Sequence, residues 1–99
     1  MKILEKLAEL PLEQRTLNFD DILGDLSVHF TQSGRVHICV GCASQVTDIS
    51  GIKLVCLRDG ECPDKQYWII ETNGTDYHVN EHIIQTLADF MEVKVMKRG

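Results

Sequence analysis

Long hydrophobic runs are missing from this chain of 99 residues, because its apolar stretches extend over four residues at most, as in Leu54–Leu57. A membrane-spanning helix needs about 20 consecutive apolar residues, so none is expected. Glu5 and Glu9 interrupt the leucines near the start, and no small-residue cleavage site follows, which argues against a secretory signal. The sequence therefore predicts a cytoplasmic protein without membrane contact.

Basic residues are also scarce, since 10 Lys+Arg stand against 15 Asp+Glu and the net charge is −5. A protein of this charge is repelled by nucleic-acid phosphates, and its bases form no stripe along the chain. Their one cluster consists of Lys94, Lys97 and Arg98, and it is more typical of a solvated terminus than of a phosphate-binding face. Nucleic acid is therefore not an expected partner.

Catalytic motifs are absent as well: there is no Gly-rich phosphate loop, no G-x-S-x-G elbow and no dinucleotide fingerprint. Residues 78–82 match the H-x-x-E-H pattern of some zinc peptidases. That chemistry needs both histidines on one helix, whereas we expect His78 in a strand and Asn80 as the cap of a helix. The match is interpreted as chance, and a small enzyme is the least favoured function.

What the chain does contain is the pattern of one globular domain, residues 1–99, with 43% apolar residues and room for a single core. Apolar residues at helical spacing predict a helix over Lys2–Leu10, which Pro11 ends, followed by a short turn to Arg15. A second helix is predicted over Glu81–Met91 with Asn80 as its N-cap.

Between the helices the hydrophobic period changes to two, which is typical of strands. Predicted strands comprise a hairpin over 27–40 with its turn at 32–35, strands at Ile52–Leu57, Gln66–Thr72 and Thr75–Val79, and a last strand at Glu92–Met96. The pattern of Asn18–Leu26 is ambiguous, and a short helix capped by Asn18 is one interpretation of it. Gly41–Gly51 is predicted to be a loop. The expected fold is α+β in two layers: a mostly antiparallel sheet of four to five strands with the N-terminal and C-terminal helices packed on one face.

The four cysteines, Cys39, Cys42, Cys56 and Cys62, allow two interpretations. Two cysteine pairs near turns can supply the four thiolates of a structural zinc site, although the second pair is separated by five residues instead of the usual two to four. Buried free thiols are the other interpretation, because cysteine packs as a small hydrophobe. A redox pair would require a helix after Cys39, and a disulfide would require an oxidising compartment. Zinc is thus the one cofactor considered.

Two further groups of side chains are singled out by their spacing. His29 and His37 are equidistant from the first hairpin turn, so they are expected to face each other as a cross-strand polar pair, with metal binding the remoter alternative. The aromatic residues Tyr67, Trp68 and Tyr77 gather on the hairpin around Asn73-Gly74. They are expected to pack in the core and to leave one face for a partner protein.

These observations favour a non-catalytic binding or regulatory module that acts through protein–protein contact. Its partner would be another protein or a second copy of the chain, with Tyr67, Trp68 and Tyr77 as candidate contact residues. A zinc-stabilised module with the four-cysteine site is the alternative.

Overall fold

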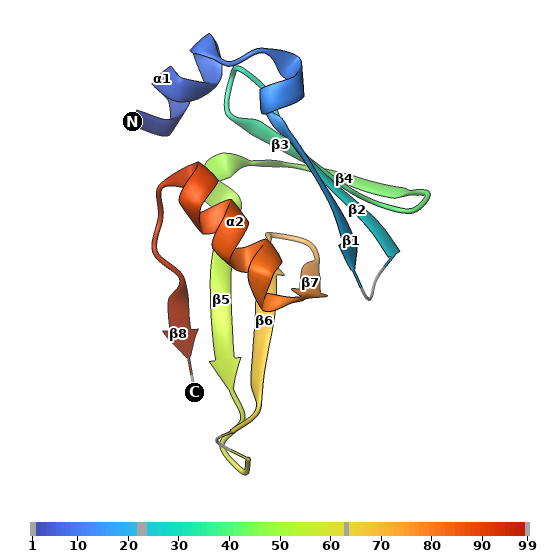
Figure 1. Ribbon diagram of the computed structural model, residues 1–99, viewed down its shortest axis with the longest axis vertical. Coiled ribbons are helices and arrows are strands. Elements are labelled where there is room, and N and C mark those ends of the chain that lie inside the picture. Colours follow the sequence, from blue (N-terminus) through green and yellow to red (C-terminus); the bar gives the residue numbers. More distant parts are fainter. Residues whose placement is uncertain (1, 22–23, 63, 99) are drawn as a thin grey trace. The chain divides into compact units, whose positions relative to one another are not determined.

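The protein forms two helices and eight strands in two four-stranded sheets over residues 2–21, 24–62 and 64–98, which the computed structural model describes (Figure 1). The predicted α+β class, the mostly antiparallel pairing and the N-terminal and C-terminal helices are confirmed. The strands are divided between two sheets, however, and do not form the single sheet of four to five strands that was predicted. The chain separates into two compact units, residues 1–51 and 52–99, and its description as a single domain stays a prediction.

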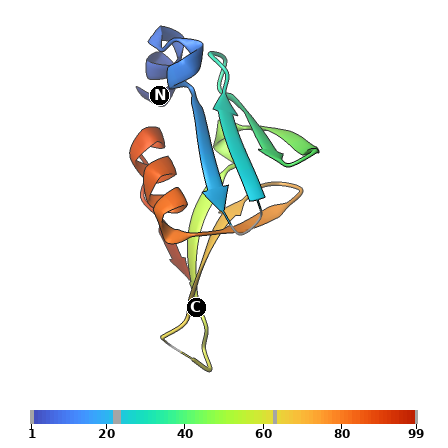
Figure 2. The same ribbon diagram turned by 45° about the vertical axis from the view of Figure 1, so that its right-hand side comes forward.

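The first unit is a meander in which each strand pairs with the next in sequence (Figure 2). Its elements are α1 (Lys2–Glu9), η1 (Leu12–Gln14), β1 (Thr16–Asp21), β2 (Gly24–Phe30), β3 (Arg35–Val40), β4 (Ala43–Asp48) and η2 (Ile49–Gly51). The predicted first helix, the short turn after Pro11 and the hairpin of β2 and β3 are therefore confirmed.

Two segments of this unit correct the prediction and account for the additional sheet. Of the segment Asn18–Leu26, which the sequence left ambiguous, the described residues 18–21 and 24–26 form strands and no helix, because β1 pairs with β2 from Thr16 opposite His29 to Asp21 opposite Gly24. The predicted loop Gly41–Gly51 is also wrong, since β4 pairs along the whole of β3. Gly41 has a φ of 57°, which allows the tight turn between these strands.

The two faces of the first sheet differ in polarity. One face carries side chains that are at most 2% exposed, namely Leu26, Val28, Phe30, Val36 and Ile38. The alternating residues of β2 and β3 point to the other face, which holds His29 and His37. The period-two pattern in the sequence therefore placed this part of the core correctly.

The second unit contains β5 (Lys53–Arg58), β6 (Gln66–Glu71), β7 (Asp76–Val79), α2 (Glu81–Met91) and β8 (Met96–Arg98). Its strand order is β7-β6-β5-β8, and β8 runs parallel to β5 while the other pairs are antiparallel. The inner position of β5 was predicted from its apolar residues on both faces and is confirmed. The last strand lies at Met96–Arg98 and not at Glu92–Met96, as predicted.

Helix α2 begins and ends where the sequence predicted, and it contacts β5 and β6 (Figure 1). Asn80 is its N-cap residue in extended conformation, although its side chain makes no capping hydrogen bond. Glu92 ends the helix in the left-handed conformation with a φ of 57°. The buried stripe is the predicted one: Ile83, Ile84, Leu87, Ala88 and Met91. No helix in the described part of the chain is long and apolar enough to cross a membrane.

The buried stripe of α2 gives a direct test of the core. Leu87→Ala should lower the free energy of unfolding by about 2–5 kcal/mol, because Leu87 is 1% exposed and its truncation leaves a cavity. The same substitution at Leu12, which is 58% exposed, should change stability by no more than about 0.5 kcal/mol. Urea denaturation of both variants measures the difference, and equal losses would contradict the assigned burial.

Candidate functional site

Three large apolar side chains lie exposed on neighbouring strands of the second sheet. Leu57 on β5 is 36% exposed, Tyr67 on β6 is 41% and Met96 on β8 is 43%. Leu57 is paired with Tyr67, and Met96 with Val55, two residues before Leu57. Residues two apart on a strand share a face, so the three side chains occupy one face of the sheet. We call this set, Leu57, Tyr67 and Met96, the apolar strip.

The apolar strip is crossed by an ion pair on the same face. Arg98 donates two hydrogen bonds to the carboxylate of Glu71, from Nη1 to Oε2 at 2.6 Å and from Nη2 to Oε1 at 3.2 Å. In the strand register, Arg98 on β8 is paired with Leu57, and Glu71 on β6 is paired with Lys53. The two side chains therefore meet diagonally across β5, at the position of Val55. By this register the pair lies between Met96 on one side and Leu57 and Tyr67 on the other, so the face carries apolar side chains and charges of both signs next to one another.

Hydrogen bonding from Arg98, helped by the nearby positive charge of Lys53, lowers the pKa of the Glu71 carboxyl. In return, the hydrogen bond to Glu71 raises the pKa of the Arg98 guanidinium. The hydrogen-bonded pair thus favours the charged form of both groups and places charges of both signs on the face of the strip.

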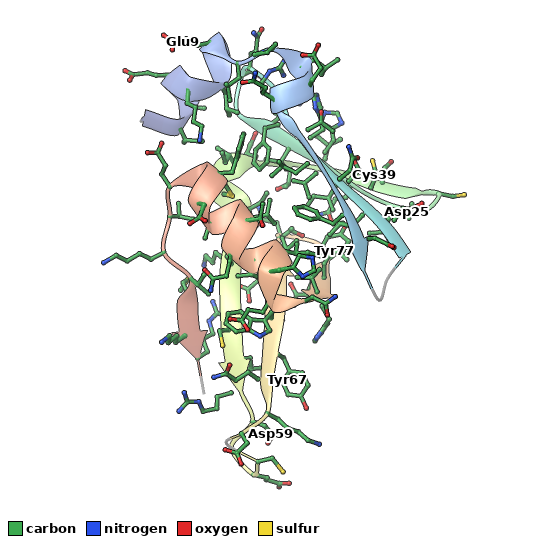
Figure 3. The ribbon with its side chains drawn as sticks, in the orientation of Figure 1. Glu9, Asp25, Cys39, Asp59, Tyr67 and Tyr77 are labelled. Carbon is green, nitrogen blue, oxygen red and sulfur yellow. The ribbon has the colours of Figure 1, made fainter. Side chains whose placement is uncertain are left out.

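The structure separates the three aromatic residues that the sequence singled out. Tyr67 projects from the lower part of β6 in Figure 3 and belongs to the strip. Trp68 and Tyr77 are half-buried and lie on the opposite face, where Trp68 stands between Cys56 and Val79. Of these three aromatic residues, only Tyr67 thus lies on the face of the apolar strip.

Two members of the strip were missed in the sequence. Leu57 could have been found, because the hairpin closed around Asp59-Gly60 pairs it with Tyr67. Met96 could not, since it joins the sheet through a parallel pairing with β5 that depends on how α2 returns the chain. Strand alternation gives no information on such a non-local neighbour.

The cysteines are distributed over both units. Cys39 is half-buried in β3, and Cys42 is exposed in the turn that follows, so Cys39 opens no helix. Cys56 is buried in β5, and Cys62 is exposed in the loop after that strand. Within the described ranges, no group of three or more His, Cys, Asp or Glu could hold a metal ion. The four-cysteine zinc site stays a prediction.

Substitution of the thiols one at a time distinguishes the two interpretations of the cysteines. Cys56→Ser should cost about 1–3 kcal/mol, because Cys56 is 4% exposed and the hydroxyl would be buried without a partner. Cys42→Ser and Cys62→Ser should stay within about 0.5 kcal/mol, since both thiols are exposed. Chemical denaturation measures these losses. Large losses at the exposed positions, with one zinc per chain in native mass spectrometry, would establish the zinc site instead.

The predicted histidine pair is present on the polar face of the first sheet. His29 and His37 are directly opposite each other, and their ring centroids lie 5.7 Å apart in an edge-to-face arrangement. Thr16 Oγ1 lies 2.8 Å from His29 Nδ1, and Arg15 donates to the carbonyl oxygens of Leu10 and Phe30. Burial, the charge of Arg15 and the neighbouring His37 lower the pKa of His29.

This lowered pKa predicts a pH dependence of stability. The unfolded chain binds a proton at His29 near its usual pKa of 6.5, whereas the folded chain does so only at lower pH. Just below pH 6.5 the unfolded state therefore binds more protons at His29 than the folded state does. The contribution of His29 to the free energy of unfolding is fully present above pH 6.5, and it is lost as the pH falls through the pKa of the folded state. Denaturation curves across this window should show a shallower slope for His29→Gln than for the wild type. Identical slopes would contradict the assignment.

The H-x-x-E-H match is not a peptidase motif in the folded chain. His78 lies in β7 and His82 in the first turn of α2, on either side of the N-cap Asn80. The two histidines therefore do not occupy one face of one helix, which the zinc chemistry requires.

Comparisons of this chain with protein-family models, with curated proteins and with solved structures found no match.

Proposed function

We propose that this protein is a binding module that acts through contact with another protein, without a catalytic step, and that the apolar strip is its contact surface. The observation that supports this is the alignment of Leu57, Tyr67 and Met96 on one face, each at least 36% exposed. Removal of apolar surface from water is favourable by about 25 cal/mol per Å², so a partner that covers these side chains gains binding free energy.

The strip resembles the centre of a protein interface in its composition. Tyrosine and methionine are enriched in interfaces, and tyrosine is frequent among the residues that contribute most binding energy. The Arg98–Glu71 pair that crosses the strip supplies both signs of charge for orienting a partner. The face is favoured over the strand edge as the site of contact, because β8 is short and its Lys97 and Arg98 discourage pairing with another strand.

A different protein is favoured over a second copy as the occupant. Two copies of a chain with net charge −5 repel each other. A stable interface also buries about 800 Å² on each side, which three side chains of one small face do not supply unless the partner surrounds them with further contacts. The expected partner presents apolar side chains to the strip and groups of either charge to the Arg98–Glu71 pair that crosses it.

Replacement of one strip residue by a charge tests this proposal. Leu57→Asp should lower the affinity for the partner by about 2 kcal/mol or more, as expected for a central interface residue, while the chain stays folded because Leu57 is partly exposed. The measurement is quantitative co-purification from the source cell, followed by titration calorimetry with the partner recovered.

The matched control is Val46→Asp, because Val46 is 52% exposed and lies on β4 in the first unit. Loss of the same partner by Leu57→Asp but not by Val46→Asp supports the proposal. Equal retention by both variants would sink it. A concentration-dependent dimer in sedimentation that only Leu57→Asp disrupts would make a second copy the occupant.

A further inference from the structure

A second surface feature lies on the opposite face of the same sheet, at the end where β5 runs into its loop. It is a pocket of about 250 Å³ lined by Cys56, Arg58, Gln66, Lys97 and Arg98. Cys56 is paired with Lys97, and Arg58 is paired with Gln66, so these four side chains share the face that Cys56 occupies. Strands β8, β5 and β6 thus place three donor groups around the buried thiol of Cys56.

The pocket is locally basic although the whole chain is acidic. Its lining contains Arg58, Lys97 and Arg98 and no carboxylate from the described residues. The guanidinium of Arg98 is already neutralised by Glu71, whereas neither Arg58 nor Lys97 forms an ion pair within the described ranges. Two positive charges are therefore available to a ligand.

The acid next to Arg58 in sequence is engaged elsewhere. Asp59 Oδ1 accepts hydrogen bonds from the backbone N–H groups of Glu61 at 2.9 Å and Cys62 at 3.3 Å. These bonds hold its carboxylate against its own loop, in an arrangement typical of turns that begin with aspartate. Asp59 thus shapes the loop beside the pocket and leaves the positive charge of Arg58 unpaired.

We infer that this pocket binds the dianionic phosphate group of a small ligand, with Arg58, Lys97 and Gln66 as its donors. Arg58 offers a planar pair of N–H groups to two oxygens, Lys97 offers a point charge, and the amide of Gln66 offers an N–H to a third oxygen. A phosphate monoester carries nearly two negative charges at neutral pH, which match the two available cations, whereas a carboxylate carries one.

The size of the pocket agrees with this ligand class. Its 250 Å³ correspond to roughly eight water molecules at about 30 Å³ each, which is room for a phosphate group and part of the molecule attached to it. The inference is independent of the apolar strip, because the strip lies on the other face of the sheet.

Titration of the full chain with inorganic phosphate, and separately with glycerol 2-phosphate, tests the inference at constant ionic strength against chloride. Trp68 is the only tryptophan and is paired with Cys56 in the pocket floor, so its fluorescence reports on binding. The NMR signals of the Arg58 Nε–H and the Gln66 amide provide a second readout. Saturable changes are expected with both probes, and the tighter probe identifies the source as free phosphate or a phosphate ester.

Variants then distinguish a site from general charge attraction. Arg58→Gln and Lys97→Gln should each weaken binding about tenfold or more, since each removes a charge-assisted hydrogen bond. Lys53→Gln makes the same charge change on the opposite face of β5 and should leave the affinity unchanged. Binding of glycerol 2-phosphate should also weaken below pH about 6, where the dianionic phosphate group takes up one proton and becomes a monoanion.

The inference is overturned by any of three results: changes that chloride reproduces, changes that do not saturate, or equal weakening by Lys53→Gln and Arg58→Gln. All three positions are exposed, so the variants should remain folded, and their NMR spectra in the absence of ligand verify this.

Discussion

The pairing of β5 with its two neighbours is the constraint on which the functional features of this protein depend. Leu54, Val55 and Cys56 are each at most 4% exposed, so β5 is buried on both faces along its middle. A shift of one residue in its register would exchange every side chain between the faces. Burial of this apolar run therefore fixes which residues of β6 and β8 stand beside it.

Because the register is fixed, the two faces of the second sheet carry different side chains near the end of β5. Leu57, Tyr67 and Met96 lie on one side, while Arg58, Gln66 and Lys97 lie on the other. Arg98 belongs to both features, because its guanidinium binds Glu71 across the strip and the residue also lines the pocket. The proposed contact surface and the proposed anion site thus lie within a few residues of each other on each strand.

On the polar face of the first sheet, strand register also decides which side chains meet. Alternation places His29 and His37 opposite each other, and their rings are arranged by Thr16 and by mutual contact. The neighbouring Arg15 is held by two backbone carbonyls, so its charge stays close to His29 and disfavours protonation there. The expected pH dependence of His29 therefore originates in a local arrangement, whereas the strip and the pocket need strands that are distant in sequence.

The sequence by itself determined the features that neighbouring residues encode. These are both helices, the hairpin of β2 and β3, the inner position of β5 and the facing histidines. Periodicity and turn residues specify these within a few positions, because they reflect backbone geometry and burial of one face. Only the tertiary structure decided that the strands divide into two sheets, that Met96 joins the strip beside Leu57 and Tyr67, and that Lys97 meets Arg58 across the pocket. These outcomes depend on pairings between distant segments, which are selected by burial of the whole chain and leave no periodic signal in any one segment.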